Sequence, residues 1–204
     1  MREFWQKNGR SVFKLYINQI AMSVFGLMVI GASGASEGDL LILLASIISV
    51  GLYLFIIYSM MWDAGAKAAA KTLRAEDAGV KKIETPFLIV LFGSTVNIIL
   101  YVIYTVAKIS AQAADFAEGS AAVAAGGIME IIIKMTNSIY MGFEALLYTE
   151  NVIMRTPPYY LFLTLLPLFA VGIGAYYLGA SEISIMRKLG FKHKHKPTYK
   201  INRK

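Results

Sequence analysis

The stretch that decides the fold is LLILLASIISVGLYLFIIYSMMW, at residues 40–62. Its 23 residues include no Asp, Glu, Lys or Arg. About 20 apolar residues in an α-helix are enough to cross the ~30 Å hydrocarbon core of a bilayer. We therefore predict that this segment is a transmembrane helix.

Three further apolar runs have similar length, at residues 15–35, 86–107 and 159–183. Pro86 suits the first turn of a helix, where the N–H that proline lacks is not needed, and Pro167 should kink the last run. Only 16% of the residues are charged, against about 25% in soluble domains. The sequence thus predicts an all-α integral membrane protein, with four transmembrane helices in one domain (residues 1–186) and a basic tail (residues 187–204).

Basic residues are concentrated in three segments that border these runs. Four precede the first run, five lie in the connection at residues 63–85 and eight follow residue 185, which together make 17 of the 20 lysines and arginines. Short loops rich in Lys and Arg stay on the cytoplasmic side. The pattern therefore predicts a multi-pass plasma-membrane protein with both termini in the cytoplasm.

The net charge of +7 fits contact with lipid better than with nucleic acid, because the cytoplasmic leaflet carries anionic headgroups that attract nearby bases. The expected partners are the lipid bilayer and a membrane protein, and no nucleic acid. Strong helix formers at residues 64–78 should extend the second helix into the cytoplasm. In this extension and in the tail, the bases expected to contact anionic headgroups are Lys67, Lys71, Arg74, Arg187, Lys188, Lys192 and Lys194. For the first three, the alternative is a helix face that contacts only water.

The segment at residues 128–148 complicates the count of spans. It is long enough to cross, but its polar residues Glu130, Lys134, Asn137, Ser138 and Glu144 fall on one stripe of a helix. One interpretation is an amphipathic helix that lies in the outer interface, or dips in and returns. The other is a fifth span, which would move the basic tail outside and place Lys134 in hydrocarbon. We favour the interfacial or re-entrant interpretation.

The first run also has two interpretations. Bases up to Lys14, an apolar run to Ile30 and small residues at 31–35 resemble a cleavable signal peptide. Because Asn18 and Gln19 dilute the start of the apolar run, we favour a retained helix.

The residues predict no enzyme, metal site or cofactor. The chain has no cysteine, and its two histidines, His193 and His195, lie among lysines in the tail. Glu130 and Glu144 share a helical face, but about 21 Å would separate them along an unbroken helix that rises about 1.5 Å per residue. These carboxylates could share one centre only if the helix were broken.

Two non-catalytic functions remain. The first is a structural or accessory component of a membrane complex, and the second is a transport subunit that binds a small neutral or amphipathic solute within the helix bundle. A cavity on which the polar residues converge would favour transport, and dense packing there would favour the first function. The residues expected to form the polar lining or helix contacts are Asn97, Glu130, Lys134, Asn137 and Glu144.

Two segments, YSMMWDAGAK at residues 58–67 and LPLFAVGIGAYYLG at residues 166–179, resemble small uncharacterised membrane proteins of Gram-positive bacteria. The motifs are loose, and Ala68 departs from the acidic residue expected at its position. The resemblance implies a multi-pass topology and a bacterial plasma membrane, and it implies no activity.

Overall fold

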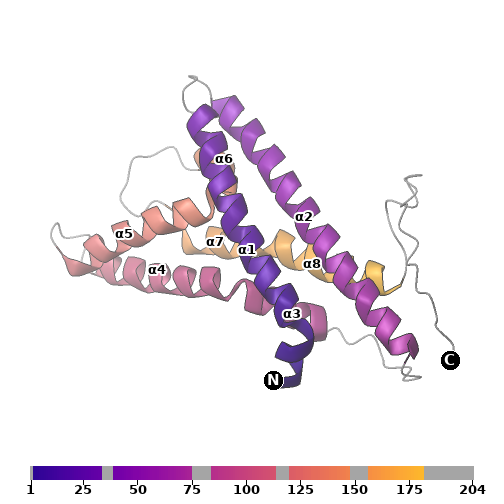
Figure 1. Ribbon diagram of the computed structural model, residues 1–204. Coiled ribbons are helices and arrows are strands. Elements are labelled where there is room, and N and C mark those ends of the chain that lie inside the picture. The colour runs from indigo at the N-terminus through magenta and orange to yellow at the C-terminus, as the bar shows by residue number, and fades with distance from the viewer. Residues whose placement is uncertain (1, 34–38, 75–83, 114–119, 148–155, 182–204) are drawn as a thin grey trace.

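The computed structural model describes residues 2–33, 39–74, 84–113, 120–147 and 156–181, and all regular structure within these ranges is helical. Four stretches in the described residues are long and apolar enough to cross a membrane: Arg2–Val29, Leu40–Ala69, Thr95–Ala113 and Pro158–Ala180. The predicted all-α class with four such helices is confirmed. The elements, drawn in Figure 1, are α1 (Arg2–Ser33), α2 (Asp39–Arg74), α3 (Glu84–Gly93), α4 (Thr95–Ala113), α5 (Ala121–Thr136), the 3-10 helix η1 (Ser138–Tyr140), α6 (Met141–Leu147), α7 (Pro158–Leu163) and α8 (Leu165–Ala180).

The first two helices form an antiparallel hairpin and are longer than their apolar runs (Figure 1). α1 begins at Arg2 rather than near residue 15, because the intervening residues include no proline that would stop a helix. α2 continues to Arg74, as the helix formers after residue 63 predict. Its 36 residues are about 54 Å long at about 1.5 Å per residue. α2 is therefore longer than a hydrocarbon core of ~30 Å requires.

The third run, predicted as a span at residues 86–107, is divided into two helices. The chain turns at Ser94, between α3 and α4. Gly/Ser pairs are common kink sites, and the hydroxyl of Thr95 donates to the carbonyl of Leu91 at 3.1 Å, a back-bond that bends helices. The stretch that is long enough to span begins at Thr95 instead and extends past residue 107 to include Lys108.

The last run is interrupted at Thr164, between α7 and α8, three residues before Pro167. Proline lacks the N–H that would bond the carbonyl four residues earlier, at Leu163, and its ring crowds that carbonyl. The interruption predicted at Pro167 is therefore displaced toward the N-terminus. The tail residues Arg187, Lys188, Lys192 and Lys194 lie outside the described residues.

Helices α2 and α8 pack backbone against backbone through two glycines. A Cβ on Gly65 would overlap the carbonyl of Tyr176, and a Cβ on Gly179 would overlap the carbonyl of Trp62. Earlier on both helices, Gly172 faces Ile57. The contact between Ile57 and Gly172 precedes those at residues 62–65 and 176–179 along both helices, and Figure 1 shows α2 and α8 running in the same general direction. The second and fourth spans of a four-span protein should be parallel in this way.

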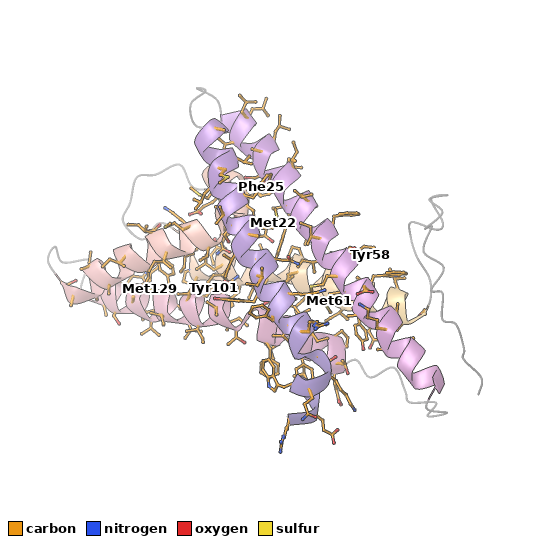
Figure 2. The ribbon with its side chains drawn as sticks, in the orientation of Figure 1. Met22, Phe25, Tyr58, Met61, Tyr101 and Met129 are labelled. Carbon is orange, nitrogen blue, oxygen red and sulfur yellow. The ribbon has the colours of Figure 1, made fainter. Side chains whose placement is uncertain are left out.

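Apolar side chains form two cores, and Figure 2 labels members of each. The first core joins α1, α2, α3 and α8 and includes Met22 and Met61. The second joins α4, α5, α7 and the start of α8 around the fully buried Tyr101, with Met129 packed against it. Large apolar side chains on the outer faces, such as Ile48, remain exposed, which is the pattern of a surface that meets lipid.

Three elements replace the single helix predicted at residues 128–148. α5 begins earlier, at Ala121, where the Oγ of Ser120 accepts the N–H of Val123 at 3.3 Å. The axis then bends by 82° between Thr136 and Ser138. Thr136, Asn137 and Ser138 compete with helical backbone bonds through their own side chains, as the 3.0 Å bond from the Thr136 hydroxyl to the Ile133 carbonyl shows. The bend is compatible with the re-entrant interpretation.

Candidate functional site

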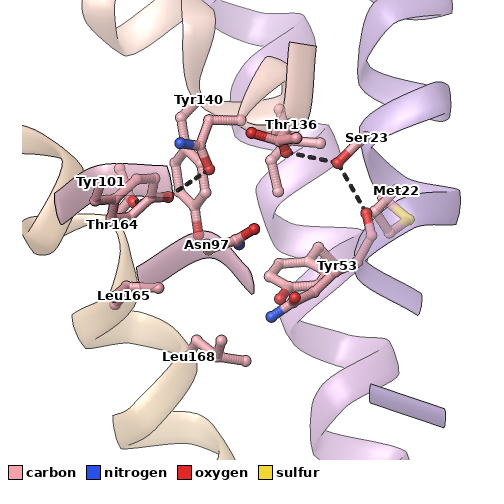
Figure 3. Close-up of a pocket in the computed structure, with 13 residues that line it drawn as sticks. Met22, Ser23, Tyr53, Asn97, Tyr101, Thr136, Tyr140, Thr164, Leu165 and Leu168 are labelled. Carbon is pink, nitrogen blue, oxygen red and sulfur yellow. Dashed lines mark hydrogen bonds between the residues drawn. The ribbon is translucent and has the colours of Figure 1, made fainter. Parts of the chain in front are cut away.

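The bend at Asn137 is docked against α1 through small residues. A Cβ on Gly26 would lie 2.7 Å from the N of Ile139, so only glycine allows this approach. The carbonyl of Thr136 loses its helical partner at the bend, because the N–H of Tyr140 bonds Asn137 O at 2.8 Å instead. Ser23 of α1 supplies a replacement, since its hydroxyl donates to Thr136 O at 2.5 Å (Figure 3).

On its other side the bent segment is docked against α2. The N–H of Gly142 donates to the hydroxyl of Ser46 at 2.8 Å, and a Cβ on Gly142 would lie 2.5 Å from the carbonyl of Ile42. Ser138 adds a second bond to α1, since its hydroxyl donates to the carbonyl of Ser23 at 2.6 Å. η1 and the start of α6 are therefore packed into the α1–α2 hairpin and do not lie on an outer surface.

A small polar cavity lies beside the bend (Figure 3). Its volume is about 20 Å³, which is room for one water molecule. Its wall contains amides and phenols and no charged side chain. The lining residues are Gln19, Met22, Ser23, Tyr53, Asn97, Tyr101, Thr136, Asn137, Ile139, Tyr140, Thr164, Leu165 and Leu168.

A second polar site, here called the Thr156 cluster, consists of Thr156, Glu130, Glu144, Lys134, Lys108 and Tyr104. The hydroxyl of Thr156 lies 3.4 Å from Oε1 of Glu130 and donates a short hydrogen bond to Oε1 of Glu144. The backbone N–H of Thr156 also points to Glu130 Oε1, at 3.4 Å. The two carboxylates meet because the 82° bend removes the separation of about 21 Å that a straight helix would impose.

Two lysines balance the two carboxylates of the Thr156 cluster. Lys134 Nζ lies 3.1 Å from Glu130 Oε1, the i, i+4 pairing expected from the sequence. Lys108 Nζ lies 3.0 Å from the carbonyl of Thr156, which also accepts the hydroxyl of Tyr104 at 2.8 Å. The cluster thus ties α4 to α5 and α6, and its formal charges cancel.

The structure divides the five residues that the sequence grouped as one polar lining. Asn97 and Asn137 line the cavity, whereas Glu130, Lys134 and Glu144 belong to the Thr156 cluster. Across the described ranges, no group of three or more His, Cys, Asp or Glu side chains could hold a metal ion.

Three important residues were missed from the sequence. Gln19 and Tyr101 both line the cavity, and each is a hydrogen-bonding side chain within an apolar run, a signal that could have been followed. Thr156 had no comparable signal, because it precedes Pro157 in a connecting segment and acquires its partners only through the tertiary fold.

Of the bases expected to contact lipid, the structure describes the side chain of one. Lys67 is exposed on the cytoplasmic extension predicted for α2, and its Nζ lies 2.5 Å from Oδ2 of Asp63. The structure does not describe the side chains of Lys71 and Arg74.

No protein-family model, curated protein or solved structure matches this chain. The function must therefore be inferred from the cavity, the Thr156 cluster and the helices that hold them.

Proposed function

We propose that this chain is a non-catalytic, multi-pass protein of the plasma membrane that acts as a structural or accessory component of a membrane complex. The main support is the size of the polar cavity. It measures about 20 Å³, whereas sites for small-molecule ligands measure about 300–1,000 Å³. Asn97 and Asn137 therefore pack around a space for one water molecule rather than around a solute.

The Thr156 cluster supports the same proposal. Ionisable residues within membrane spans often mark the path of a proton or ion. Here, however, Glu130 is paired with Lys134 and accepts the backbone N–H of Thr156, and Glu144 accepts the Thr156 hydroxyl. A neutral, internally bonded cluster suits a structural tie between helices better than a site that must bind and release a cation.

The proposed topology has both termini in the cytoplasm. The Lys and Arg bias of the connections and the parallel course of α2 and α8 both favour four spans, with α5 to α6 as a re-entrant segment. The contacts of α1 favour a helix that is retained rather than cleaved as a signal peptide. Leu15 is part of the first core, and the Ser23 hydroxyl donates a hydrogen bond to the bend. Lys67 and the neighbouring bases would then face anionic headgroups.

Single-cysteine labelling tests this topology, since the chain has no cysteine of its own. We expect Gly38→Cys to react with a membrane-impermeant maleimide in intact cells. Lys200→Cys and Lys7→Cys should react only after the cells are permeabilised. Labelling of Lys200→Cys but not of Lys7→Cys in intact cells would mean an odd number of spans, with α5 and α6 forming a broken fifth span.

Co-purification tests the accessory role. The tagged full-length chain, crosslinked in native membranes and extracted in mild detergent, should retain a membrane-protein partner in a fixed ratio. A multi-pass protein of similar size, expressed at the same level, serves as the control. Recovery of the chain without any specific partner would contradict the proposal, and recovery of a transporter ATPase would favour the second candidate.

The second candidate, a transport subunit, is favoured by one observation. A helix interrupted beside a polar cavity, as α5 and η1 are at Asn137, is the arrangement in which many transporters bind solutes. Saturable uptake of a small neutral solute by vesicles that contain the purified chain would support this candidate.

A further inference from the structure

Two buried polar atoms around the cavity, Asn137 Nδ2 and the hydroxyl of Tyr140, have no hydrogen-bond partner among the described residues. A third, Gln19 Nε2, makes no hydrogen bond of full geometry there, although the Gln19 side chain lies within reach of Tyr53. Gln19 is only 8% exposed. Buried polar groups in native proteins are almost always paired with protein or with ordered water, because an unpaired group lowers stability. Such atoms around one cavity therefore point to an occupant that bonds them.

We propose that this cavity binds one water molecule, which joins Gln19 of α1 to the bend at Asn137 and Tyr140. The volume of about 20 Å³ admits one water and little else. No charged side chain lines the cavity, so a neutral occupant is favoured over an ion.

The hydrogen bonds at the cavity wall also favour water. Thr164 donates its hydroxyl proton to Leu161 O at 2.6 Å, while Tyr101 lies 3.3 Å from Thr164 Oγ1 and 2.8 Å from Asn137 Oδ1. If Tyr101 donates to Thr164, the Asn137 amide turns to donate to Tyr101 and presents its oxygen to the cavity. If Tyr101 donates to Asn137, the amide presents its NH₂ group. Water can donate and accept, so it satisfies either orientation.

The water would satisfy polar groups at the bend that Ser23 does not reach. Breaks in membrane helices are tolerated where neighbouring side chains and ordered waters satisfy the freed polar groups. Ser23 bonds Thr136 O on one side of the bend, and the water would bond Asn137 and Tyr140 at the bend itself. This inference holds for either of the two candidate functions.

A pair of Tyr→Phe variants tests the proposal by the sign of their effects. If water bonds the hydroxyl of Tyr140, Tyr140→Phe should lower the melting temperature of the purified full chain, by about 2–4 °C if one hydrogen bond is lost. If the cavity is dry, the same variant removes an unpaired hydroxyl and should raise the melting temperature. Tyr58 is the matched control, because its buried hydroxyl also lacks a described partner but does not line the cavity. Tyr58→Phe should leave the melting temperature unchanged or raise it.

Further measurements separate the remaining outcomes. If Tyr140→Phe does not fold, Gln19→Met should lower the melting temperature by the same reasoning. Replacing sodium by choline, or chloride by gluconate, should not shift the melting temperature of the unaltered chain, and a shift would identify an ion and overturn the proposal. A high-resolution structure should show one density peak within hydrogen-bond distance of Gln19 and Tyr140. The proposal would also be overturned if Tyr140→Phe and Tyr58→Phe raised the melting temperature by the same amount.

Discussion

Adding one methyl group, in Gly179→Ala, is expected to destabilise the protein by about 3 kcal/mol, at the upper end of what overpacking usually costs. The added Cβ would overlap the carbonyl of Trp62, and a backbone carbonyl inside a helix cannot rotate away as a side chain can. Helices α2 and α8 would have to separate. The melting temperature should fall by about 6–12 °C, since about 1 kcal/mol corresponds to 2–4 °C in a chain of this size.

The sign of this effect is diagnostic, because Gly→Ala inside a helix normally stabilises it by up to about 1 kcal/mol. Gly174→Ala is the matched control on the same helix, since a Cβ at Gly174 has nothing within 4 Å, and this variant should match or exceed the original melting temperature. Intrinsic fluorescence during heating provides the measurement, with Trp62 as a reporter at the contact itself. If Gly179→Ala and Gly174→Ala behave alike, α2 and α8 do not pack as described.

The opposing glycine gives a further check on the same contact. Gly65→Ala should act like Gly179→Ala, because its Cβ would overlap the carbonyl of Tyr176. Both substitutions separate the same two helices, so together they should cost less than the sum of their separate effects. Simple additivity would place the two glycines at independent contacts.

Replacing the Glu130 carboxylate, in Glu130→Leu, is expected to reduce the free energy of unfolding by about 3 kcal/mol. Removing one partner of a buried ion pair costs roughly 3–5 kcal/mol, and the lower figure applies because the side chain of Lys134 is 33% exposed. The substitution also removes the acceptor of the backbone N–H of Thr156. The same thermal measurement should show a fall of about 6–12 °C.

A double substitution and a second ion pair are the controls for Glu130→Leu. Adding Lys134→Met removes the stranded ammonium and should restore part of the lost stability. Lys67 and Asp63 have the same i, i+4 spacing, but their side chains are 68% and 51% exposed, so Asp63→Leu should cost less than about 1 kcal/mol. Equal losses for Glu130→Leu and Asp63→Leu would show that the Thr156 cluster is not a buried structural tie.

Several features of this protein follow from short stretches of the sequence alone. The absence of charge over residues 40–62 determines a helix that can span a membrane, since helix length and apolar composition are local properties. The pairing of Glu130 with Lys134 follows from their spacing on one helix. Pro86 stands in the first turn of α3 for a similarly local reason. The count of four spanning helices could be predicted for these reasons.

Only the tertiary structure decided where the polar residues meet. Thr136 to Ser138 weaken the helix locally, but the 82° bend is held by Gly26, Ser23 and Ser46, which lie about a hundred residues away in the chain. The bend brings Glu130 and Glu144 together at Thr156 and leaves Asn97 and Asn137 at a separate cavity. No periodicity within one segment encodes these contacts, because they depend on how closely glycines and serines allow distant helices to approach.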